Sequence, residues 1–253
     1  MFKPTIVALL YFAFVGVISA NPTGRIVGGI DATEGQFAHQ ISLRYSGSHI
    51  CGGSIISRNY ILTAGHCVGD EDEDGIYHVD DPKYYTIRAG SSNRLSGGVV
   101  IAVETITVHE SYGNFLNDVA LLKLSTPLIY SANIKAIPLA SSEVTPGEKV
   151  IISGWGRLKT GGDIPLKLQW TTLEAISKTK CLTTIGMFSD TLICLAHDPN
   201  FGACNGDSGG PAIYNGELVG VAGFVVGGCG SKNPDGYAKV FYHVEWIKKH
   251  SDL

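Results

Sequence analysis

The chain has 253 residues, a net charge of -4, and 44% hydrophobic against 17% charged residues. This length allows one large all-β unit or two halves of ordinary domain size, and the acidic balance argues against a nucleic-acid-binding protein. The 32 glycines and the modest charge content are typical of many short strands joined by tight turns.

The first 20 residues have the parts of a secretory signal peptide. Lys3 supplies a positive charge, residues 6–17 are almost wholly apolar, and Ser19 and Ala20 are small residues suited to a cleavage site. A membrane anchor is the alternative, but a spanning helix needs about 20 apolar residues. We therefore predict that residues 1–20 are removed on export, and that the mature protein is secreted and not held in a membrane.

Residues 21–25 separate this signal from an apolar start at Ile26. The segment reads Asn-Pro-Thr-Gly-Arg, and its proline and glycine are typical of irregular, exposed structure. We interpret residues 21–25 as a tether that is cut after Arg25, ahead of a folded region at 26–253.

Strand-like runs then recur at short intervals, punctuated by glycine, asparagine, serine and proline. Asn215-Gly216, between two such runs, is a strong hairpin signal. Only residues 242–250 show helical periodicity, so we expect an all-β chain with a short C-terminal helix. The predicted strands cover residues 39–45, 54–62, 84–89, 99–108, 119–124, 149–153, 166–174, 211–214, 217–224 and 236–240.

Six cysteines in an exported chain indicate three disulfides, although their spacing leaves the pairing open. No CxxC or HExxH spacing suggests a metal site instead. A run of carboxylates at 70–74, followed by Asp80 and Asp81, is interpreted as a solvated loop. A loop that screens partners and a weak calcium site are the alternatives, but carboxylates alone do not specify an ordered cage.

Three segments supply the side chains of a nucleophilic site. They are LTAGHC with His66, NDVALL with Asp118 and GDSGGP with Ser208. A serine hydroxyl is a weak nucleophile at neutral pH, so it needs a base that takes its proton and a third group that orients this base. The order histidine, aspartate, serine is one of the known chain orders of hydrolytic triads. The three segments therefore predict a serine hydrolase, and we interpret the chain as a secreted serine endopeptidase.

The sequence around Ser208 also fits the G-x-S-x-G pattern of α/β-hydrolases. That fold needs a helix directly after the serine, whereas Gly-Gly-Pro follows here and opposes a helix. It also places its acid and histidine after the serine, where only Asp235 or Glu245 with His243 or His250 remain. The esterase alternative is therefore disfavoured.

With these segments, the chain resembles trypsin-like and chymotrypsin-like serine proteases, in particular arthropod-type chymotrypsin-like or broad-specificity members. The resemblance covers residues 26–253 and is carried by IVGG from Ile26, TAGHC, DVALL, GWG from Gly154 and GDSGGP. It implies two packed six-stranded antiparallel β-barrels with a boundary near residue 139 and the site in the cleft between them. It also implies a monomer without cofactor or metal that meets protein or peptide substrates, an activating protease and protein inhibitors.

The resemblance also implies a role for each triad residue. Ser208 attacks the scissile carbonyl, His66 takes and returns the proton, and Asp118 orients the imidazole. The backbone N–H groups of Gly206 and Ser208 would form the oxyanion hole. A catalytically silent homologue that binds partners is the non-enzyme alternative, but such proteins usually lose a triad residue and this chain keeps all three.

Activation and cross-links follow from the same resemblance. Cleavage after Arg25 would free the ammonium group of Ile26, which inserts beside the carboxylate of Asp207. The implied disulfides are Cys51–Cys67, Cys181–Cys194 and Cys204–Cys229.

Three positions bear on the primary substrate pocket. Gly202 stands at the pocket floor, where trypsins carry an aspartate, and Asp235 aligns with a second position on the pocket wall. Val225 stands where a glycine normally opens the pocket. We therefore expect chymotrypsin-like or broad apolar specificity, with elastase-like and basic-residue specificity as the alternatives.

Three further departures from the family pattern have expected consequences. Gly65 replaces the usual alanine before the histidine, which is a small change. Gly223 replaces a serine that supports the catalytic aspartate, so we expect Asp118 to have one hydrogen bond fewer. Residues 91–99 lack the glutamates of the family's calcium loop, so we expect no calcium there.

Overall fold

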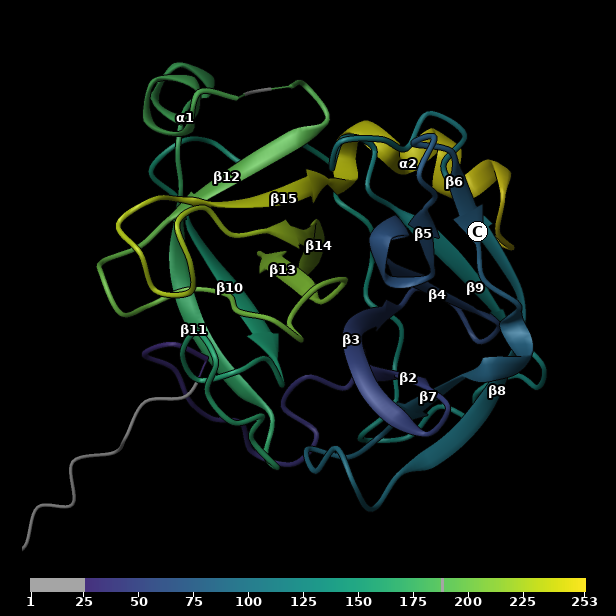
Figure 1. Cartoon of the computed structure of the whole chain (residues 1–253). Helices are drawn as coiled ribbons and strands as arrows, with labels where there is room; N and C mark the ends of the chain where they lie inside the picture. The colour runs from purple at the N-terminus through teal and green to yellow at the C-terminus, as the bar shows by residue number, and fades with distance from the viewer. Residues whose placement is uncertain (1–25, 188) are drawn as a thin grey trace, which may run out of the picture.

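The computed structural model describes residues 26–187 and 189–253. The predicted signal peptide, the tether at 21–25 and Arg25 lie outside the described residues. Figure 1 shows two rounded β units that stand side by side, each closed on itself. The predicted fold class, all-β with two six-stranded antiparallel barrels and a short C-terminal helix, is confirmed.

The first barrel closes in the order β2-β3-β4-β9-β8-β7. Alternate residues point inward, as in β7, where Tyr85, Ile87 and Ala89 are buried and the two residues between them are half-buried. The inward side chains, among them Ile41 and Leu121, form an apolar core. The strands are β2 (Gln40–Tyr45), β3 (Ser48–Ile55), β4 (Tyr60–Thr63), β7 (Tyr85–Ala89), β8 (Val99–Val108) and β9 (Ala120–Leu124).

The second barrel closes because β11 pairs with both β10 and β12, and the short strand β1 (Ile30–Asp31) adds to its edge. The predicted hairpin joins β13 and β14 through Asn215 and Gly216, which both have positive φ angles of 49° and 80°. The other strands are β10 (Lys149–Gly154), β11 (Gln169–Ala175), β12 (Leu192–Ala196), β13 (Pro211–Tyr214), β14 (Glu217–Phe224) and β15 (Asp235–Lys239).

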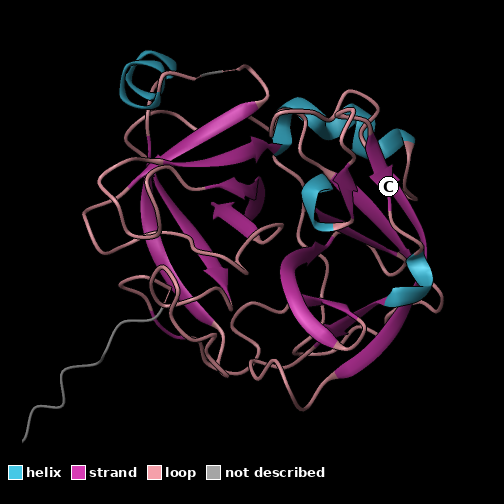
Figure 2. Ribbon diagram, in the orientation of Figure 1, coloured by secondary structure: helices cyan, strands magenta, loops and turns pink. Residues whose placement is uncertain are grey.

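The two α-helices of the described residues are short and lie at the periphery of the molecule (Figure 2). Helix α1 (Lys178–Ile185) precedes β12, and helix α2 (Val240–Lys249) leaves β15 and passes over the first barrel (Figure 1). In α2, Nε2 of His243 lies 3.3 Å from Oδ1 of Asn117, the residue before Asp118. Two 3-10 turns (Gly65–Cys67 and Pro82–Tyr84) and a hairpin of β5 (Gly69–Glu71) with β6 (Tyr77–Val79) complete the elements. None of these helices is both long and apolar enough to cross a membrane.

The two barrels meet along a seam of close backbone contacts. The N–H of Gly52 in β3 donates to the carbonyl oxygen of Ser208 at 2.7 Å. A Cβ on Gly52 would lie 2.8 Å from Cα of Gly210, so only glycine permits this approach. Nearby, Oγ of Ser153 donates to Oε1 of Gln40 at 2.7 Å, and both side chains are buried. The seam therefore positions the segment around Ser208 against the first barrel.

Most predicted strands agree with the structure to within a few residues, but one predicted strand covers parts of two, and several elements were not predicted. The run at 54–62 is the end of β3, a turn and β4, because the Ser57 hydroxyl accepts the N–H groups of Asn59 and Tyr60 and reverses the chain. Strands β1, β5, β6 and β12 and helix α1 were not predicted. Strand β12 is short and buried, and α1 carries only one buried residue, Cys181, so neither has a clear sequence period.

Candidate active site

His66 and Asp118 form a closely bonded pair at the seam. The 3-10 turn Gly65–Cys67 carries His66, and Asp118 lies just before β9. Nδ1 of His66 lies 2.7 Å from Oδ2 of Asp118, and the His66 backbone N–H donates to Oδ1 at 3.0 Å. The exposed fraction is 23% for the imidazole and 1% for the carboxylate. With Nδ1–H donating to the carboxylate, Nε2 is left with a lone pair toward solvent, the tautomer that a general base needs.

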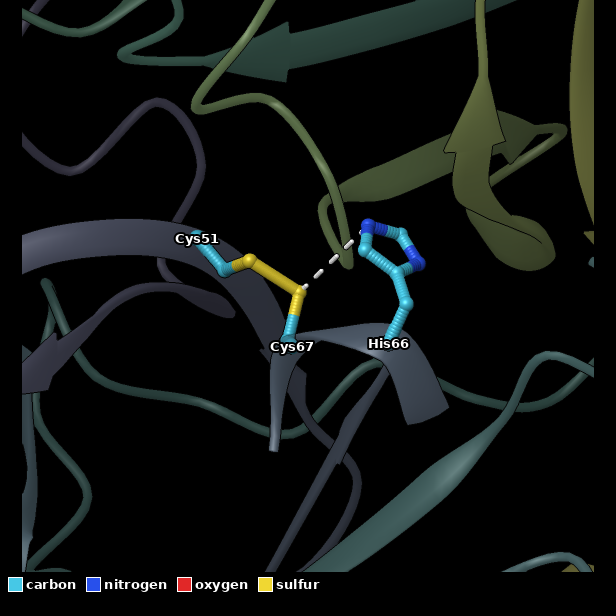
Figure 3. Close-up of side chains that lie close together, drawn as sticks. All are labelled: Cys51, His66 and Cys67. Atoms are coloured by element: carbon cyan, nitrogen blue, oxygen red, sulfur yellow. Dashed lines mark hydrogen bonds between the residues drawn. A yellow bond between two sulfur atoms is a disulfide. The ribbon is translucent and has the colours of Figure 1, made fainter. Parts of the chain in front are cut away.

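Ser208 and His66 line the same open cavity of about 330 Å³. Within the described part of the chain, no hydrogen bond joins Oγ of Ser208 to the imidazole, and such bonds are often long before substrate binds. Figure 3 shows the disulfide sulfur of Cys67, which lies 4.0 Å from Nε2 of His66. The three side chains Cys51, His66 and Cys67 cluster as metal ligands would. The two sulfurs are in a disulfide, so they offer no thiolate and do not fit a metal ion.

The backbone before Ser208 presents two unused donors. Among residues 26–187 and 189–253, the N–H groups of Gly206 and Ser208 have no protein acceptor. Gly206 has φ +99°, which only glycine adopts readily. Its carbonyl oxygen lies 3.2 Å from Nε2 of His49, whose Nδ1 is 2.8 Å from Oγ of Ser42. Burial lowers the pKa of His49 to about 4, so this imidazole is neutral. Its Nε2–H donates to the Gly206 carbonyl and so holds the peptide between Gly206 and Asp207.

Asp207 lies buried between the donors and the second barrel. Its carboxylate accepts the N–H groups of Gly156 at 2.7 Å and Cys204 at 2.9 Å. A Cβ on Gly154 or Gly156 would lie within 2.1 Å of a carboxylate oxygen, so the Gly-Trp-Gly segment leaves the space that this side chain occupies. Burial raises the pKa of Asp207 to about 7, although both hydrogen bonds oppose that shift. Ile26 is also completely buried.

The cavity that holds Ser208 and His66 continues into a mostly apolar recess. Its lining includes Ala203, Ala222, Val225, Gly236 and Tyr237. Of the three residues predicted for the substrate pocket, only Val225 therefore lines the cavity.

Gly202 and Asp235 lie beneath that recess and are not part of its surface. Oδ2 of Asp235 accepts the N–H of Ala203 at 2.7 Å, and the carboxylate is 3% exposed. Beside it lies the buried imidazole of His197, a residue for which the sequence indicated no role. The carboxylate is thus one backbone layer away from the cavity wall.

Comparison with known proteins places this geometry in a family. The trypsin family matches residues 26–247. The chain belongs to the trypsin family. It is 46% identical to serine protease SP24D of Anopheles gambiae over 88% of this chain and 80% of that protein. It is 42% identical to trypsin delta of Drosophila melanogaster over 88% and 87% of the two chains, and 39% identical to trypsin alpha of Drosophila erecta over 88% and 86%. The chain is thus a serine endopeptidase of this family, which acts on proteins.

The three disulfides of this trypsin-family protease join the pairs that the resemblance implies. Cys51–Cys67 ties β3 to the turn that carries His66. Cys181–Cys194 ties α1 to β12. Cys204–Cys229 ties the segment before Ser208 to the loop after β14.

Two departures from the family pattern sit directly against Asp118. A Cβ on Gly65 would lie 3.2 Å from Oδ1 of Asp118 and 3.3 Å from the ring of Tyr112, so glycine gives the tyrosine room here. A Cβ on Gly223 would lie 3.5 Å from Oδ2 of Asp118. Within the described residues, both hydrogen bonds to this carboxylate come from His66.

Two aromatic side chains at the protease's cavity were not predicted from the sequence. Phe115, at a positive φ of 59°, places its ring 5.9 Å from the imidazole of His66 and 5.7 Å from the ring of Phe224. Both phenylalanines line the cavity. Gly236 gives the Phe224 ring its space, because a Cβ there would lie 2.2 Å from a ring carbon.

The acidic run after His66 is folded against itself. Oδ1 of Asp72 accepts the N–H groups of Asp74 and Ile76, and Oδ2 lies 2.7 Å from Nε2 of His78. Asp80 accepts the hydroxyl of Tyr85 at 2.6 Å. These contacts close the β5–β6 hairpin. The carboxylates of Asp72 and Asp80 thus accept hydrogen bonds from groups of the protein.

Proposed function

We propose that this protease hydrolyses peptide bonds through an acyl-enzyme formed on Ser208, with His66 as the base and Asp118 as the group that orients it. The observation that carries the proposal is the 2.7 Å contact of His66 Nδ1 with a buried carboxylate, in a cavity that His66 shares with Ser208. In this tautomer Nε2 accepts the proton of Oγ as the hydroxyl attacks the carbonyl carbon.

The developing negative charge on the carbonyl oxygen then needs donors that are already oriented. The N–H groups of Gly206 and Ser208 are suited to this because they have no acceptor among the described residues, and His49 holds the peptide between Gly206 and Asp207, which lies between the two donors in the chain. Loss of one such donor costs about 2.7–4 kcal/mol of transition-state stabilisation in comparable enzymes. His66 returns the proton to the leaving amine, and water repeats the sequence to release the acid.

We propose further that the protein is made with a signal peptide at 1–20 and an activation peptide at 21–25, and that the protease unit at 26–253 is secreted. Cleavage after Arg25 by an activating protease would create an ammonium group on Ile26. Asp207 supports this because its carboxylate is buried and, within the described part of the chain, faces no cation. A buried charge without a partner is costly, so the new ammonium would pair with it.

This pairing predicts a loss of activity at alkaline pH. The ammonium gains a partner on folding, so its pKa is raised in the active form and the active form is lost as pH rises through that value. Carbamylation of the Ile26 amine in the processed enzyme should therefore abolish activity. Full activity of the carbamylated enzyme would contradict the model.

For specificity we propose chymotrypsin-like or broad apolar preference, supported by the aliphatic and glycine lining of the recess. Val225 lines its entrance, so Val225→Gly should raise kcat/KM for a phenylalanine substrate relative to an alanine substrate. An elastase-like enzyme would show the reverse order in the native protein, with alanine preferred. Partners of the site would be protein substrates and protein inhibitors that present the same type of side chain.

The function is tested by labelling the processed protein with a fluorescent organophosphonate and by peptide hydrolysis. The native protein should be labelled at Ser208 and be active, and Ser208→Ala should be neither. A catalytically silent homologue would give no label in the native protein, although it would be folded.

A further inference from the structure

A second buried histidine–carboxylate pair lies directly under the substrate recess. Nε2 of His197 lies 3.4 Å from Oδ1 of Asp235, and the two side chains are 1% and 3% exposed. This is an ion-pair distance, without the alignment of a good hydrogen bond. The register of β12 with β15 explains the contact: Leu195 pairs with Asp235, so His197 follows two residues later beside the same end of β15.

Gly202 is what gives this pair its space. A Cβ at Gly202 would lie 2.6 Å from Nε2 of His197 and 2.7 Å from Oδ2 of Asp235. An aspartate at this position, as trypsins carry, would collide with both side chains. The buried pair of His197 and Asp235 therefore requires a glycine at position 202.

The pair is separated from the substrate recess by a single backbone layer. Asp235 accepts the N–H of Ala203, and its chain neighbour is Gly236; both of these residues line the recess. A charge on the pair therefore acts on the recess through protein. Protein weakens electrostatic interactions less than water does.

The number of protons on the pair sets its charge. Nδ1 of His197 lies 3.0 Å from the carbonyl oxygen of Asp198, so an Nδ1–H donates there. Nε2 then faces Oδ1 of Asp235, and one further proton between these two atoms makes the pair neutral. Loss of that proton to solvent leaves a carboxylate whose one described hydrogen bond comes from Ala203.

Both shifts in acidity favour the proton-bound pair near neutral pH. Burial lowers the pKa of His197, but the Asp235 carboxylate outweighs it, and the net shift is upward. Burial raises the pKa of Asp235. A cavity of about 320 Å³ on the outer side of the barrel is also lined by His197.

Other charged groups face the pair from the elements packed around it. On the outer side these are Asp198, which follows His197, and the Lys149–Glu174 ion pair of β10 and β11, with its atoms 2.7 Å apart. On the inner side these are Asp207 and Tyr237. The outer ion pair is neutral as a unit, and Tyr237 holds its proton throughout the neutral range because burial raises its pKa.

We propose that His197 is a specificity-determining residue, and that the proton it shares with Asp235 switches the recess between uncharged and basic substrate side chains. With the proton bound, the neutral pair leaves an apolar recess. With the proton lost, the negative charge beneath the floor attracts the cation of arginine or lysine. This inference rests on the proposed function and adds to its apolar specificity a dependence on pH.

The test compares two peptide substrates that differ only in arginine or its uncharged isostere citrulline before the scissile bond. Any change in the triad or at the Ile26 amine affects both substrates equally, so the ratio of their kcat/KM values isolates the charge of the substrate side chain. We expect the arginine-to-citrulline ratio to rise about tenfold between pH 5 and pH 9, the change that corresponds to about one pKa unit of interaction. A ratio constant within twofold over this range would overturn the proposal.

Variants assign the effect to the pair. His197→Gln removes a group that lowers the pKa of Asp235, so the rise in the ratio should move to higher pH. Asp235→Asn should make the ratio low and independent of pH. His78→Gln removes a histidine from an exposed pair with Asp72 and should behave as the native enzyme. If His197→Gln does not fold, the native profile and Asp235→Asn decide. A wild-type profile retained in either folded variant would refute the assignment.

A binding readout separates this inference from the proposed function. In processed Ser208→Ala, calorimetry should show that benzamidine, a cation, binds more tightly as pH rises, whereas neutral benzamide does not. Failure of organophosphonate labelling with this binding trend intact would count against the proposed chemistry alone. Labelling and turnover with no such trend would count against the pair alone.

Discussion

Asp118 forms two hydrogen bonds with His66. Asp118 accepts both the ring and the backbone N–H of His66, so the carboxylate sets the position of the histidine as well as its tautomer. Gly223, which lies beside this carboxylate, has no side chain that could donate to it. The site therefore depends on bonds within one residue pair.

Gly223→Ser should add the missing donor. The new Cβ would lie 3.5 Å from Oδ2 of Asp118 and 3.2 Å from the Gly236 carbonyl oxygen, which leaves room after a small adjustment. One more hydrogen bond to the carboxylate contributes about 1 kcal/mol, so kcat/KM should rise by up to about fivefold. Steady-state kinetics measures this, with Gly223→Ala as the control of equal bulk. An equal gain in both variants would show that the hydroxyl plays no part.

Asp207 should make the uncut protein less stable as pH rises. Its folded pKa, about 7, lies above the ordinary value of 3.8. The stability that this group contributes is therefore fully present below about pH 4 and is lost as pH rises to about 7, on the order of a few kcal/mol. Urea unfolding of the uncut chain in a Ser208→Ala background, compared with the same chain carrying Asp207→Asn, isolates the effect. Parallel pH curves for the two proteins would contradict it.

At the scale of elements, two of the three disulfides contrast in their position relative to the site. Cys51–Cys67 joins β3 to the turn of His66, whereas Cys181–Cys194 joins α1 to β12 on the far side of the second barrel. Figure 1 shows α1 well away from the seam.

Removal of each cross-link should separate stability from activity. Cys181→Ala with Cys194→Ala should lower the free energy of unfolding by about 2–4 kcal/mol and leave kcat/KM nearly unchanged at low temperature. Cys51→Ala with Cys67→Ala should cost as much stability and also lower kcat/KM, because the His66 turn loses its anchor. Denaturant unfolding and kinetics on both proteins measure this. Equal kinetic losses in the two proteins would refute the distinction.

The helices and strands differ in how well they could be predicted from the sequence. Strands β8, β13 and β14 were predicted with their observed bounds, since each is a clean run between turn residues. The 3-10 turn Gly65–Cys67 and helix α1 were not predicted. Each is held in place by a disulfide, and α1 also by its N-cap, so neither shows a hydrophobic period in its sequence.

The site divides in the same way. The motifs around His66, Asp118 and Ser208 identified the candidate chemistry because their spacing is specific. Nothing local marks His197, which meets Asp235 only through the pairing of β12 with β15. Phe115 and His49 likewise reach the cavity region through loops and strands that are distant in sequence.

For the whole molecule, the bond from Ser153 to Gln40 couples the two barrels inside the protein. Gln40→Ala leaves the Ser153 hydroxyl buried without its acceptor, which should lower the free energy of unfolding by about 1–3 kcal/mol. Adding Ser153→Ala should cost little more, so the double-mutant cycle should give a coupling of about 1 kcal/mol. Denaturant unfolding of the four proteins measures it. Additive losses would show that the barrels are not coupled here.

The contact of Gly52 with the carbonyl oxygen of Ser208 has a consequence for how the enzyme fails. The nucleophile belongs to one barrel by sequence and is fastened to the other by its own peptide group. Neither barrel can therefore unfold without displacing Ser208, and we expect a partly unfolded molecule to be inactive. Thermal inactivation should coincide with the cooperative loss of tertiary structure.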